Sequence, residues 1–395
     1  MPARKRRSRP ARKPNSFRRW SLALFLAVLS VLIVAQRLRH TLPPSKSIPR
    51  LISDSEARGI AVRYTAILQR EGGSNLWVKR ATRPSLDHHT PLLGEVLALT
   101  PVSPTIIASL EKEAAREGLH LQVSTREHRP SPTETLMLFR GKEAICGWRL
   151  REVARLYRAA IIIDDLGQDV KIARQVFSLS GAVTVSVLPH LPASGQTAAE
   201  AHRAGREVML HLPMEALPNV KGSGGENTLC EGMPGIEVER IIASGLDSVP
   251  YASGVNNRMG SRATTSASLM SEVMKTLASR RLYFIDSRTS ASSVALRAAH
   301  EAGLPAFYRS VFLDDTENVE YTLGELQRLC GVVREQGVAL AIGHPHPTTL
   351  AALGRFLPEL DRDDIELVPP SKIVRLPEVA RLSPRGEHVI ANEAD

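Results

Sequence analysis

The stretch RAAIIIDDLGQD, residues 158–169, decides how the rest of the chain is interpreted. Three isoleucines run directly into the adjacent carboxylates of Asp164 and Asp165, and Gly167 follows them. Such an unbroken apolar run is typical of a strand buried on both faces of a parallel sheet. One Asp after a strand is usually the N-cap of the next helix. Two are not explained in this way, because neighbouring residues of a strand point in different directions. The pair is therefore a candidate functional site.

The pattern that begins here continues to about residue 376. Seven short apolar runs alternate with amphipathic segments of helical spacing, which predicts a parallel sheet covered by helices. The runs are 159–163, 182–189, 207–213, 252–257, 281–286, 338–343 and 365–369; the helical candidates are 169–179, 193–204, 236–246, 267–280, 291–302, 321–336 and 348–357. The predicted fold class is α/β, an irregular or incomplete (β/α) barrel of about seven strands over 158–376. No GxGxxG follows the first strand and no GxxxxGK[ST] occurs, so a nucleotide-binding motif is not indicated.

Polar side chains collect where the predicted strands end. Because the carboxyl ends of the strands build the active site of a βα barrel, these residues are expected to converge. They lie in Asp164–Asp165, HLPME (211–215), NNRMGSR (256–262), DSRT (286–289) and HPHP (344–347).

The chemistry available to this set is hydrolysis. A carboxylate and an imidazole can hold a divalent metal that polarises a carbonyl, a second carboxylate can accept the proton of water, and a histidine can protonate the leaving group. A serine hydrolase is disfavoured because no serine lies in a G-x-S-x-G motif.

Six motifs, in order, resemble the divergent polysaccharide deacetylases, a bacterial envelope branch related to the metal-dependent carbohydrate esterases. They are IIIDDLG, HLPME, GVNNRMGSR, YFIDSRTS, VFLDD and AIGHPHPTTLAAL, between residues 161 and 353. The resemblance implies a hydrolase acting on C–N bonds other than peptide bonds, with a divalent metal, zinc in the first place, and an N-acetylated cell-envelope glycan as substrate.

The resemblance also implies a role for individual residues. Asp164 would be the base and His344 the acid, with Arg288 or Arg262 orienting the base. Predicted metal ligands are Asp165, His211 and Glu215, the last standing where the related esterases have a second histidine. The remaining predicted substrate-binding residues are Asn257, Arg262, Asp286 and His346.

One position departs from the pattern. Within NNRMGSR this chain has Arg258, where a histidine is expected in relatives. Arginine cannot ligate a metal and carries a positive charge. A second class of function therefore stays open: a catalytically silent protein that keeps the barrel to bind a glycan or a partner. Whether an oligomer forms is not indicated by the sequence.

The net charge of +10 does not indicate nucleic-acid binding, because residues 1–19 hold nine of the 51 basic residues and no acid. The uncharged segment 20–36 that follows predicts a transmembrane anchor, with a cleavable signal peptide as the alternative. The basic flank predicts a single-pass protein of the bacterial inner membrane whose body is periplasmic or extracytoplasmic.

The remaining segments complete the predicted organisation: a basic cytoplasmic tail at 1–19, a linker at 37–50, a small α+β domain at 51–150 and a tail at 377–395. The three cysteines, Cys146, Cys230 and Cys330, are too widely spaced for a zinc ribbon, and a single disulfide among them stays open.

Overall fold

The computed structural model describes residues 52–79, 81–82, 90–126, 133–218, 225–360, 362–376 and 379. The predicted basic tail, anchor and linker lie outside the described residues, as does nearly all of the predicted C-terminal tail. Across the residues described, no helix is both long enough and apolar enough to cross a bilayer. This finding corrects the predicted localisation as a single-pass inner-membrane protein with a periplasmic or extracytoplasmic body.

A five-stranded sheet with two helices precedes the barrel. The strand order is β1-β2-β5-β4-β3. The elements are α2 (Asp54–Gly72), β1 (Leu76–Val78), β2 (Leu92–Ala98), α3 (Pro104–Arg116), β3 (His120–Arg126), β4 (Thr133–Arg140) and β5 (Glu143–Glu152). Helix α3 starts as its sequence predicts: Pro104 occupies the first turn, and the backbone N–H of Ile106 donates to Ser103 Oγ. These elements correspond to the predicted small α+β region, whose boundaries stay a prediction.

The second sheet carries the candidate site, and its strands are all parallel in the described part of the chain. Eight strands follow the order β11-β10-β9-β8-β7-β6-β13-β12, and β14 pairs with β6 off this path. The strands are β6 (Tyr157–Leu166), β7 (Thr184–Val187), β8 (Val208–Met214), β9 (Ala252–Met259), β10 (Tyr283–Asp286), β11 (Ala306–Tyr308), β12 (Val311–Phe312), β13 (Val338–Gly343) and β14 (Ile365–Leu367).

This sheet curves back toward its own start. Strands β11 and β12 stand at opposite ends of the path, yet only Arg309 and Ser310 separate them in the sequence. Arg309 N–H donates to the carbonyl of Asp286 at the end of β10, and Ser310 N–H donates to that of Leu340 in β13. The structure is therefore an α/β sheet consistent with a (β/α) barrel, called the barrel below. The seven predicted runs correspond to seven of its strands, while the short β11 and β12 were not predicted.

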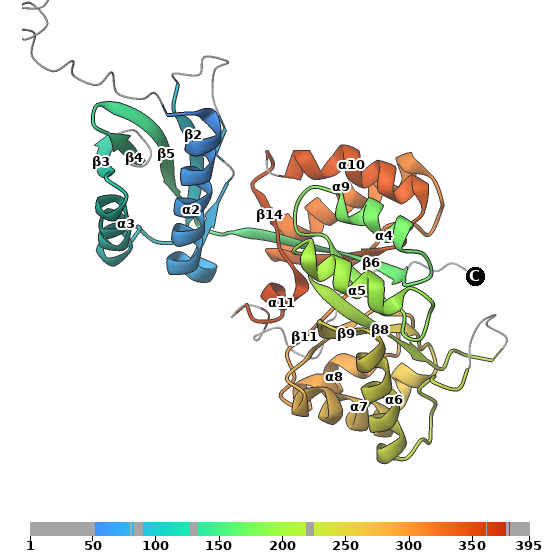
Figure 1. Cartoon of the computed structure of the whole chain (residues 1–395). Helices are drawn as coiled ribbons and strands as arrows, with labels where there is room; N and C mark the ends of the chain where they lie inside the picture. The colour runs from blue at the N-terminus through green and yellow to red at the C-terminus, as the bar shows by residue number, and fades with distance from the viewer. Residues whose placement is uncertain are drawn as a thin grey trace, which may run out of the picture. The chain divides into compact units, whose positions relative to one another are not determined.

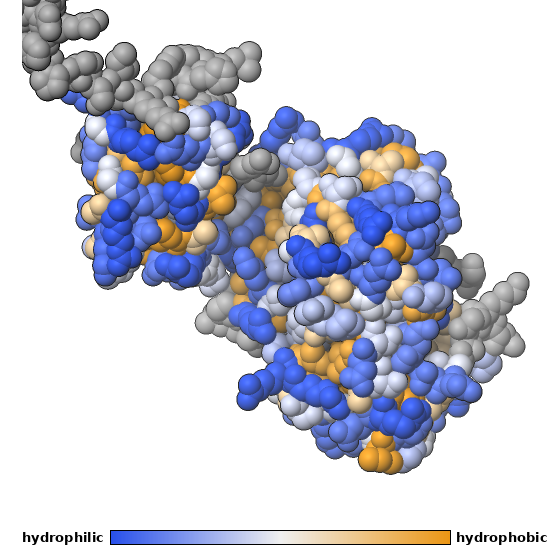
Figure 2. All heavy atoms as spheres, in the orientation of Figure 1, coloured by the Kyte–Doolittle hydropathy of each residue, from blue (hydrophilic) through white to orange (hydrophobic). Residues whose placement is uncertain are grey.

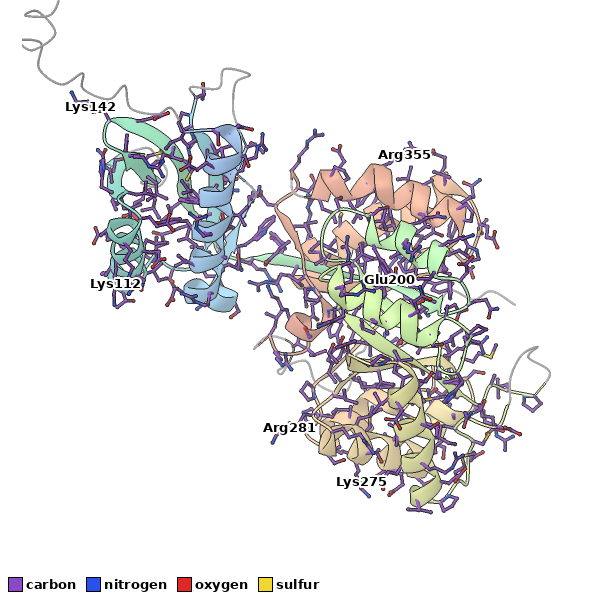
Figure 3. The ribbon with its side chains drawn as sticks, viewed as in Figure 1. Lys112, Lys142, Glu200, Lys275, Arg281 and Arg355 are labelled. Carbon is purple, nitrogen blue, oxygen red and sulfur yellow. The ribbon has the colours of Figure 1, made fainter. Side chains whose placement is uncertain are left out.

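Helices follow the strands and cover the outside of the barrel, as Figure 1 shows for α4 to α10. They are α4 (Val170–Phe177), α5 (Ser194–Arg203), α6 (Gly235–Ser248), α7 (Ala267–Ser279), α8 (Ala295–Glu301), α9 (Val319–Gln336) and α10 (Pro347–Leu360). Their outer faces are polar: the side chains of Lys275 and Arg355 point away from the sheet (Figure 3), and the visible face of the barrel is mostly hydrophilic (Figure 2). This is the expected pattern for amphipathic helices packed on a buried sheet.

Two apolar layers lie on the two faces of the barrel sheet. The layer toward the helices contains Ile161, Ile163 and Leu210. The layer inside the barrel contains Ile162 and Met209, each displaced by one residue along its strand. Since side chains alternate along a strand, the next inward positions after this apolar interior are those of Asp164 and His211. The barrel interior thus ends, on the carboxyl side, in ionisable groups.

At the opposite end of β6 a buried ion pair joins two strands. Arg158 Nε donates to Glu366 Oε2 at 3.0 Å, and strand pairing places the two residues opposite each other. We expect Glu366→Gln to lower the free energy of unfolding by about 3–5 kcal/mol, because it removes the carboxylate charge from a buried ion pair. Urea unfolding with an unchanged m-value is the measurement.

An exposed ion pair supplies the matched control for this prediction. Glu359 pairs with Arg362 at 2.8 Å, with side chains 51% and 75% exposed. Glu359→Gln is expected to cost less than about 1 kcal/mol, as surface pairs do. Equal effects of the two substitutions would show that burial of the Arg158–Glu366 pair does not matter to stability.

Candidate active site

The end of β6 is irregular, and this irregularity directs both aspartates into the barrel mouth. Along β6, Ile163 pairs with Val185 of β7 but Leu166 pairs with Val187, so one extra residue is accommodated between them. Asp165 adopts a left-handed φ of 57° at this bulge. The alternation expected of a regular strand is therefore broken, and a histidine of β8 contacts both carboxylates.

That histidine is His211, which is 3% exposed. Its Nε2 lies 3.3 Å from Asp165 Oδ1 and 3.7 Å from Asp164 Oδ2. Its Nδ1 lies 3.1 Å from Asn256 Oδ1, and the register of β8 and β9 places Asn256 directly opposite it. The predicted proximity of His211 to the aspartate pair is found, and Asn256 orients the ring.

Asn256 is the centre of a buried network that the sequence reasoning missed. Its Nδ2 donates to both oxygens of Asp164, at 2.9 and 3.0 Å, and its Oδ1 accepts from Ser186 Oγ at 2.6 Å. A third contact joins Nδ2 to Ser287 Oγ at 3.3 Å. The network fixes the Asp164 carboxylate although this group is only 2% exposed. The pairing of β8 with β9, which places Asn256 opposite His211, is the signal that identifies Asn256.

The two adjacent carboxylates have pKa values shifted in opposite directions. Burial raises the pKa of Asp164, an effect only partly offset by the His211 charge and the Asn256 hydrogen bonds. Burial also acts to raise the pKa of Asp165, but the neighbouring His211, His344 and Arg258 charges outweigh it and hold this pKa well below its usual range. Such a divergence is typical of sites that separate a proton acceptor from a permanently ionised group.

A second histidine faces these carboxylates from β13. His344 follows the end of that strand, and its Nδ1 lies 3.1 Å from Asp314 Oδ1. The Asp314 carboxylate also accepts the backbone N–H of His344 at 2.5 Å and Thr349 Oγ1 at 2.8 Å. Burial acts to lower the pKa of His344, but the contact with Asp314 and the charges of Asp164 and Asp165 raise it.

Asp314 is a second residue that the prediction of the site left out. It belongs to the VFLDD motif and follows β12, but a two-residue strand gives no periodic signal of its own. His346, predicted beside His344, is partly exposed and lies 3.6 Å from Glu317 Oε1.

Arg258 reaches the same carboxylate as His211. Its Nε lies 3.5 Å from Asp165 Oδ1. Asp165 Oδ1 is therefore flanked by an imidazole and a guanidinium.

The contacts of the Glu215 carboxylate are with residues other than Asp165 and His211, and its role as a ligand stays a prediction. Its Oε1 lies 3.3 Å from Arg262 Nη1, and its Oε2 accepts the backbone N–H of Glu231 at 2.9 Å. Arg262 Nε also donates to Glu231 Oε2 at 3.0 Å. Glu215 and Arg262, the latter predicted to bind substrate or orient the base, thus hold loop segments together.

Three further predicted residues contact other residues near the barrel mouth in the described structure. Asn257 Oδ1 accepts the N–H of Ser287, and its Nδ2 donates to the Met259 carbonyl at 2.7 Å. Asp286, whose pKa burial raises, accepts the N–H of Arg288 and Ser293 Oγ, both at 2.8 Å. The Arg288 guanidinium stacks on the Tyr308 ring, with Cζ 3.7 Å from the ring centroid. Among the described residues it makes no hydrogen bond or ion pair with Asp164. These contacts shape the loops around the mouth.

Two sets of side chains come into question for a metal. Asp165 Oδ1 and His211 Nε2 are spaced as two ligands of one zinc would be, about 3.3 Å apart. Among the residues that the structure describes, no third His, Cys, Asp or Glu ligand atom forms a metal-sized group with these two, and Arg258 lies beside Asp165. A catalytic zinc takes three protein ligands, so Asp165 and His211 alone do not fit one.

The other set is Asp314, His344 and His346, whose ligand atoms all lie within 4.8 Å of one another. These residues can hold a metal ion. The Asp314 carboxylate, however, is already satisfied by three hydrogen bonds from His344 and Thr349. The three cysteines are free, and none belongs to either set.

Comparison with known proteins places this geometry in a family. A family model described as divergent polysaccharide deacetylase matches residues 161–374, a little over half of the chain. The chain belongs to the divergent polysaccharide deacetylases. Every residue of the site described above lies within the matched segment, so this family member has a deacetylase-type domain with Asp164, Asp165, His211 and His344 at the barrel mouth.

Relatives of this divergent polysaccharide deacetylase occur in bacteria. YibQ of Escherichia coli K12 is 40% identical over 227 residues, which cover 58% of this chain and 70% of YibQ. A Haemophilus influenzae protein is 35% identical over 211 residues, 53% of this chain and 74% of its own length. The crystal structure of a protein from Agrobacterium tumefaciens C58 is similar with a TM-score of 0.53 at 25% identity, covering 56% of this chain and 90% of that one.

Proposed function

We propose that the barrel binds an N-acetylated cell-envelope glycan and hydrolyses its acetamide groups, releasing acetate and leaving a free amine on the sugar. The observation that carries this proposal is the opposite shift of the pKa values of Asp164 and Asp165 in a family of deacetylase type. One carboxylate is adapted to accept a proton and the other to stay ionised.

Asp164 is the proposed general base. Its raised pKa makes it a better proton acceptor than an ordinary aspartate. It would remove a proton from the water whose oxygen attacks the acetyl carbonyl carbon. The Asn256 network holds both carboxylate oxygens in place during this step.

His344 is the proposed general acid. It would give its proton to the sugar nitrogen as the C–N bond of the tetrahedral intermediate breaks, so that acetate and an amine are the products. The raised pKa of His344 favours the protonated imidazole, and the Asp314 carboxylate fixes the ring through Nδ1. The free Nε2 is then the atom from which the proton leaves.

Arg258, and His211 when it is protonated, would stabilise the oxyanion of that intermediate. His211, whose pKa is raised by the two aspartates against the effect of its burial, and Arg258 both lie beside Asp165. Fixed charges in a site of low water content stabilise developing charge strongly. A divalent metal would supply Lewis-acid activation in other members of such a family. No step here depends on one, because the donor set at Asp165 is incomplete.

A second function is favoured by the incomplete donor set at Asp165 and His211. In that case the barrel binds an acetylated glycan without turning it over, and Arg258 serves recognition alone. Oligomers of N-acetylglucosamine separate the two functions: the enzyme releases acetate and generates free amines in equal amounts, whereas the binding protein gives a binding isotherm and no acetate.

The pH dependence of the proposed reaction follows from the two shifted groups. We expect kcat/KM to fall at low pH as Asp164 becomes protonated, above the ordinary range for aspartate, and to fall at high pH as His344 loses its proton, above about 6.5. Asp314→Asn removes the charge that raises the pKa of His344 while burial still lowers it. The alkaline limb of the pH profile should therefore move to lower pH.

Asp315→Asn is the matched control, because Asp315 is the exposed neighbour of Asp314 in the same motif. It should leave the alkaline limb where it is. An alkaline limb that stays unchanged in Asp314→Asn would show that His344 is not the group that titrates there.

A further inference from the structure

Two buried polar atoms at the barrel mouth face each other without a hydrogen bond. Asp165 Oδ1 and Arg258 Nε are 3.5 Å apart, and among the described side chains neither has a hydrogen-bond partner. The hydrogen bond found for the Arg258 guanidinium is a weak one, from Nη1 to the sulfur of Met259 at 3.8 Å. The guanidinium therefore keeps most of its donors available to a ligand.

The position of Arg258 is set by strand pairing and not by a loop. It lies in β9 opposite Pro213 of β8, two residues after Asn256, which lies opposite His211. Residues two apart on a strand project on the same side, so Arg258 extends from the same face as the Asn256 network. His211 Nε2 lies 3.3 Å from the oxygen that Arg258 approaches.

A metal held by Asp165 and His211 would have to bind this same oxygen. Two protein ligands are one fewer than a catalytic zinc takes, and a guanidinium has no lone pair to serve as the third. A bound divalent cation would also lie beside the positive charge of Arg258.

From this geometry we infer that Arg258 is the resident cation of the site and takes the place of a divalent metal beside the Asp165 carboxylate. Its N–H groups are the donors that meet the acetyl oxygen of the substrate, or another anionic oxygen in that position. The inference concerns the site of the proposed function, but it states which cation is present and does not require turnover.

The test is zinc binding by the 395-residue chain, measured by calorimetric titration and by zinc content after dialysis. The wild-type chain and each variant are also measured with His211→Ala added. The difference between the two measurements is the His211-dependent binding, and it excludes zinc bound at Asp314, His344 and His346. Wild-type protein should show no His211-dependent zinc binding. Arg258→His supplies an imidazole in place of the guanidinium. This variant should bind about one zinc, with an affinity at least about 100-fold higher than that of the wild-type chain. A gain of that size exceeds the effect of residues that only orient metal ligands through hydrogen bonds.

Arg262→His is the matched control, since Arg262 lies four residues further on, outside the Asp165–His211 contact. It should gain no His211-dependent binding. Adding Asp165→Ala to Arg258→His should abolish the gained affinity.

Two results overturn the inference. One is near-stoichiometric, His211-dependent zinc binding by the wild-type chain, which decides the question even if Arg258→His does not fold. The other is a folded Arg258→His variant, with a cooperative thermal transition, that binds zinc no better than Arg262→His. Failure to release acetate would contradict the proposed function but would leave this inference standing.

Discussion

Replacing Asp164 by asparagine is expected to lower kcat for acetate release from N-acetylglucosamine oligomers by about 10²–10⁴-fold, the range that general acid–base groups contribute. The amide has nearly the same shape as the carboxyl group but cannot accept the proton of the attacking water. KM should change much less, because the proposed contact of Asp164 is with the attacking water and not with the sugar. Initial rates of acetate and amine formation measure both quantities.

Asp315→Asn is the control for the chemical change itself, since that aspartate is exposed. It should retain activity within about threefold, as surface substitutions that change stability little should. Thermal unfolding of the Asp164→Asn variant excludes loss of the fold as the cause. A folded Asp164→Asn variant that keeps wild-type kcat would remove Asp164 from the role of base.

His344→Ala should show an effect that depends on the leaving group. On an N-acetylated sugar the amine leaves only after it is protonated, so the loss of the acid should cost about 10²–10⁴-fold in kcat. An aryl acetate releases a phenolate that needs no proton, and on this substrate the loss should be below about tenfold. Comparing the two substrates on one variant separates the loss of proton donation from a structural disturbance of the site, which would lower kcat on both.

His346→Ala is the matched variant here, because His346 lies two residues away and contacts Glu317 instead of Asp314. We expect it to resemble wild type on both substrates. Equal losses on the two substrates in His344→Ala would argue against an acid and for a positioning role. Equal losses of kcat in His344→Ala and His346→Ala would show that the contact with Asp314 does not make His344 the general acid.

The parts of the fold that repeat along the chain were predictable from the sequence. The run of isoleucines in β6 and six further apolar runs marked strands that the structure contains, because burial on both faces removes polar residues from them. Strands β11 and β12 were not predicted, since three and two residues are too few for a periodic pattern.

The site residues show where pattern reasoning stops. Strand alternation separates Asp164 from Asp165, yet a bulge with a left-handed residue turns both toward His211, and nothing local in the sequence specifies it. Asn257 was expected in the site, whereas its neighbour Asn256 is the one that contacts Asp164. Neighbouring residues of a strand point to opposite faces, so a pattern read from the sequence does not separate these two asparagines.

Glu215 illustrates a different limit. Its spacing of four from His211 implied a ligand through the family resemblance, but the contacts of its carboxylate come from Arg262 and Glu231, which are distant in sequence. Asp314 was missed because the two-residue strand before it gives no periodic signal and its partner His344 is 30 residues away. Tertiary contacts between loops decide these roles.

The most direct test of the account is acetate release from N-acetylglucosamine oligomers by the purified 395-residue chain, measured beside its Asp164→Asn variant. The account predicts that the wild-type chain forms acetate and free amine in equal amounts, and that the variant, still folded and still binding the oligomer, forms at least about 100-fold less. A wild-type chain that binds the oligomer but forms no more acetate than Asp164→Asn would contradict it.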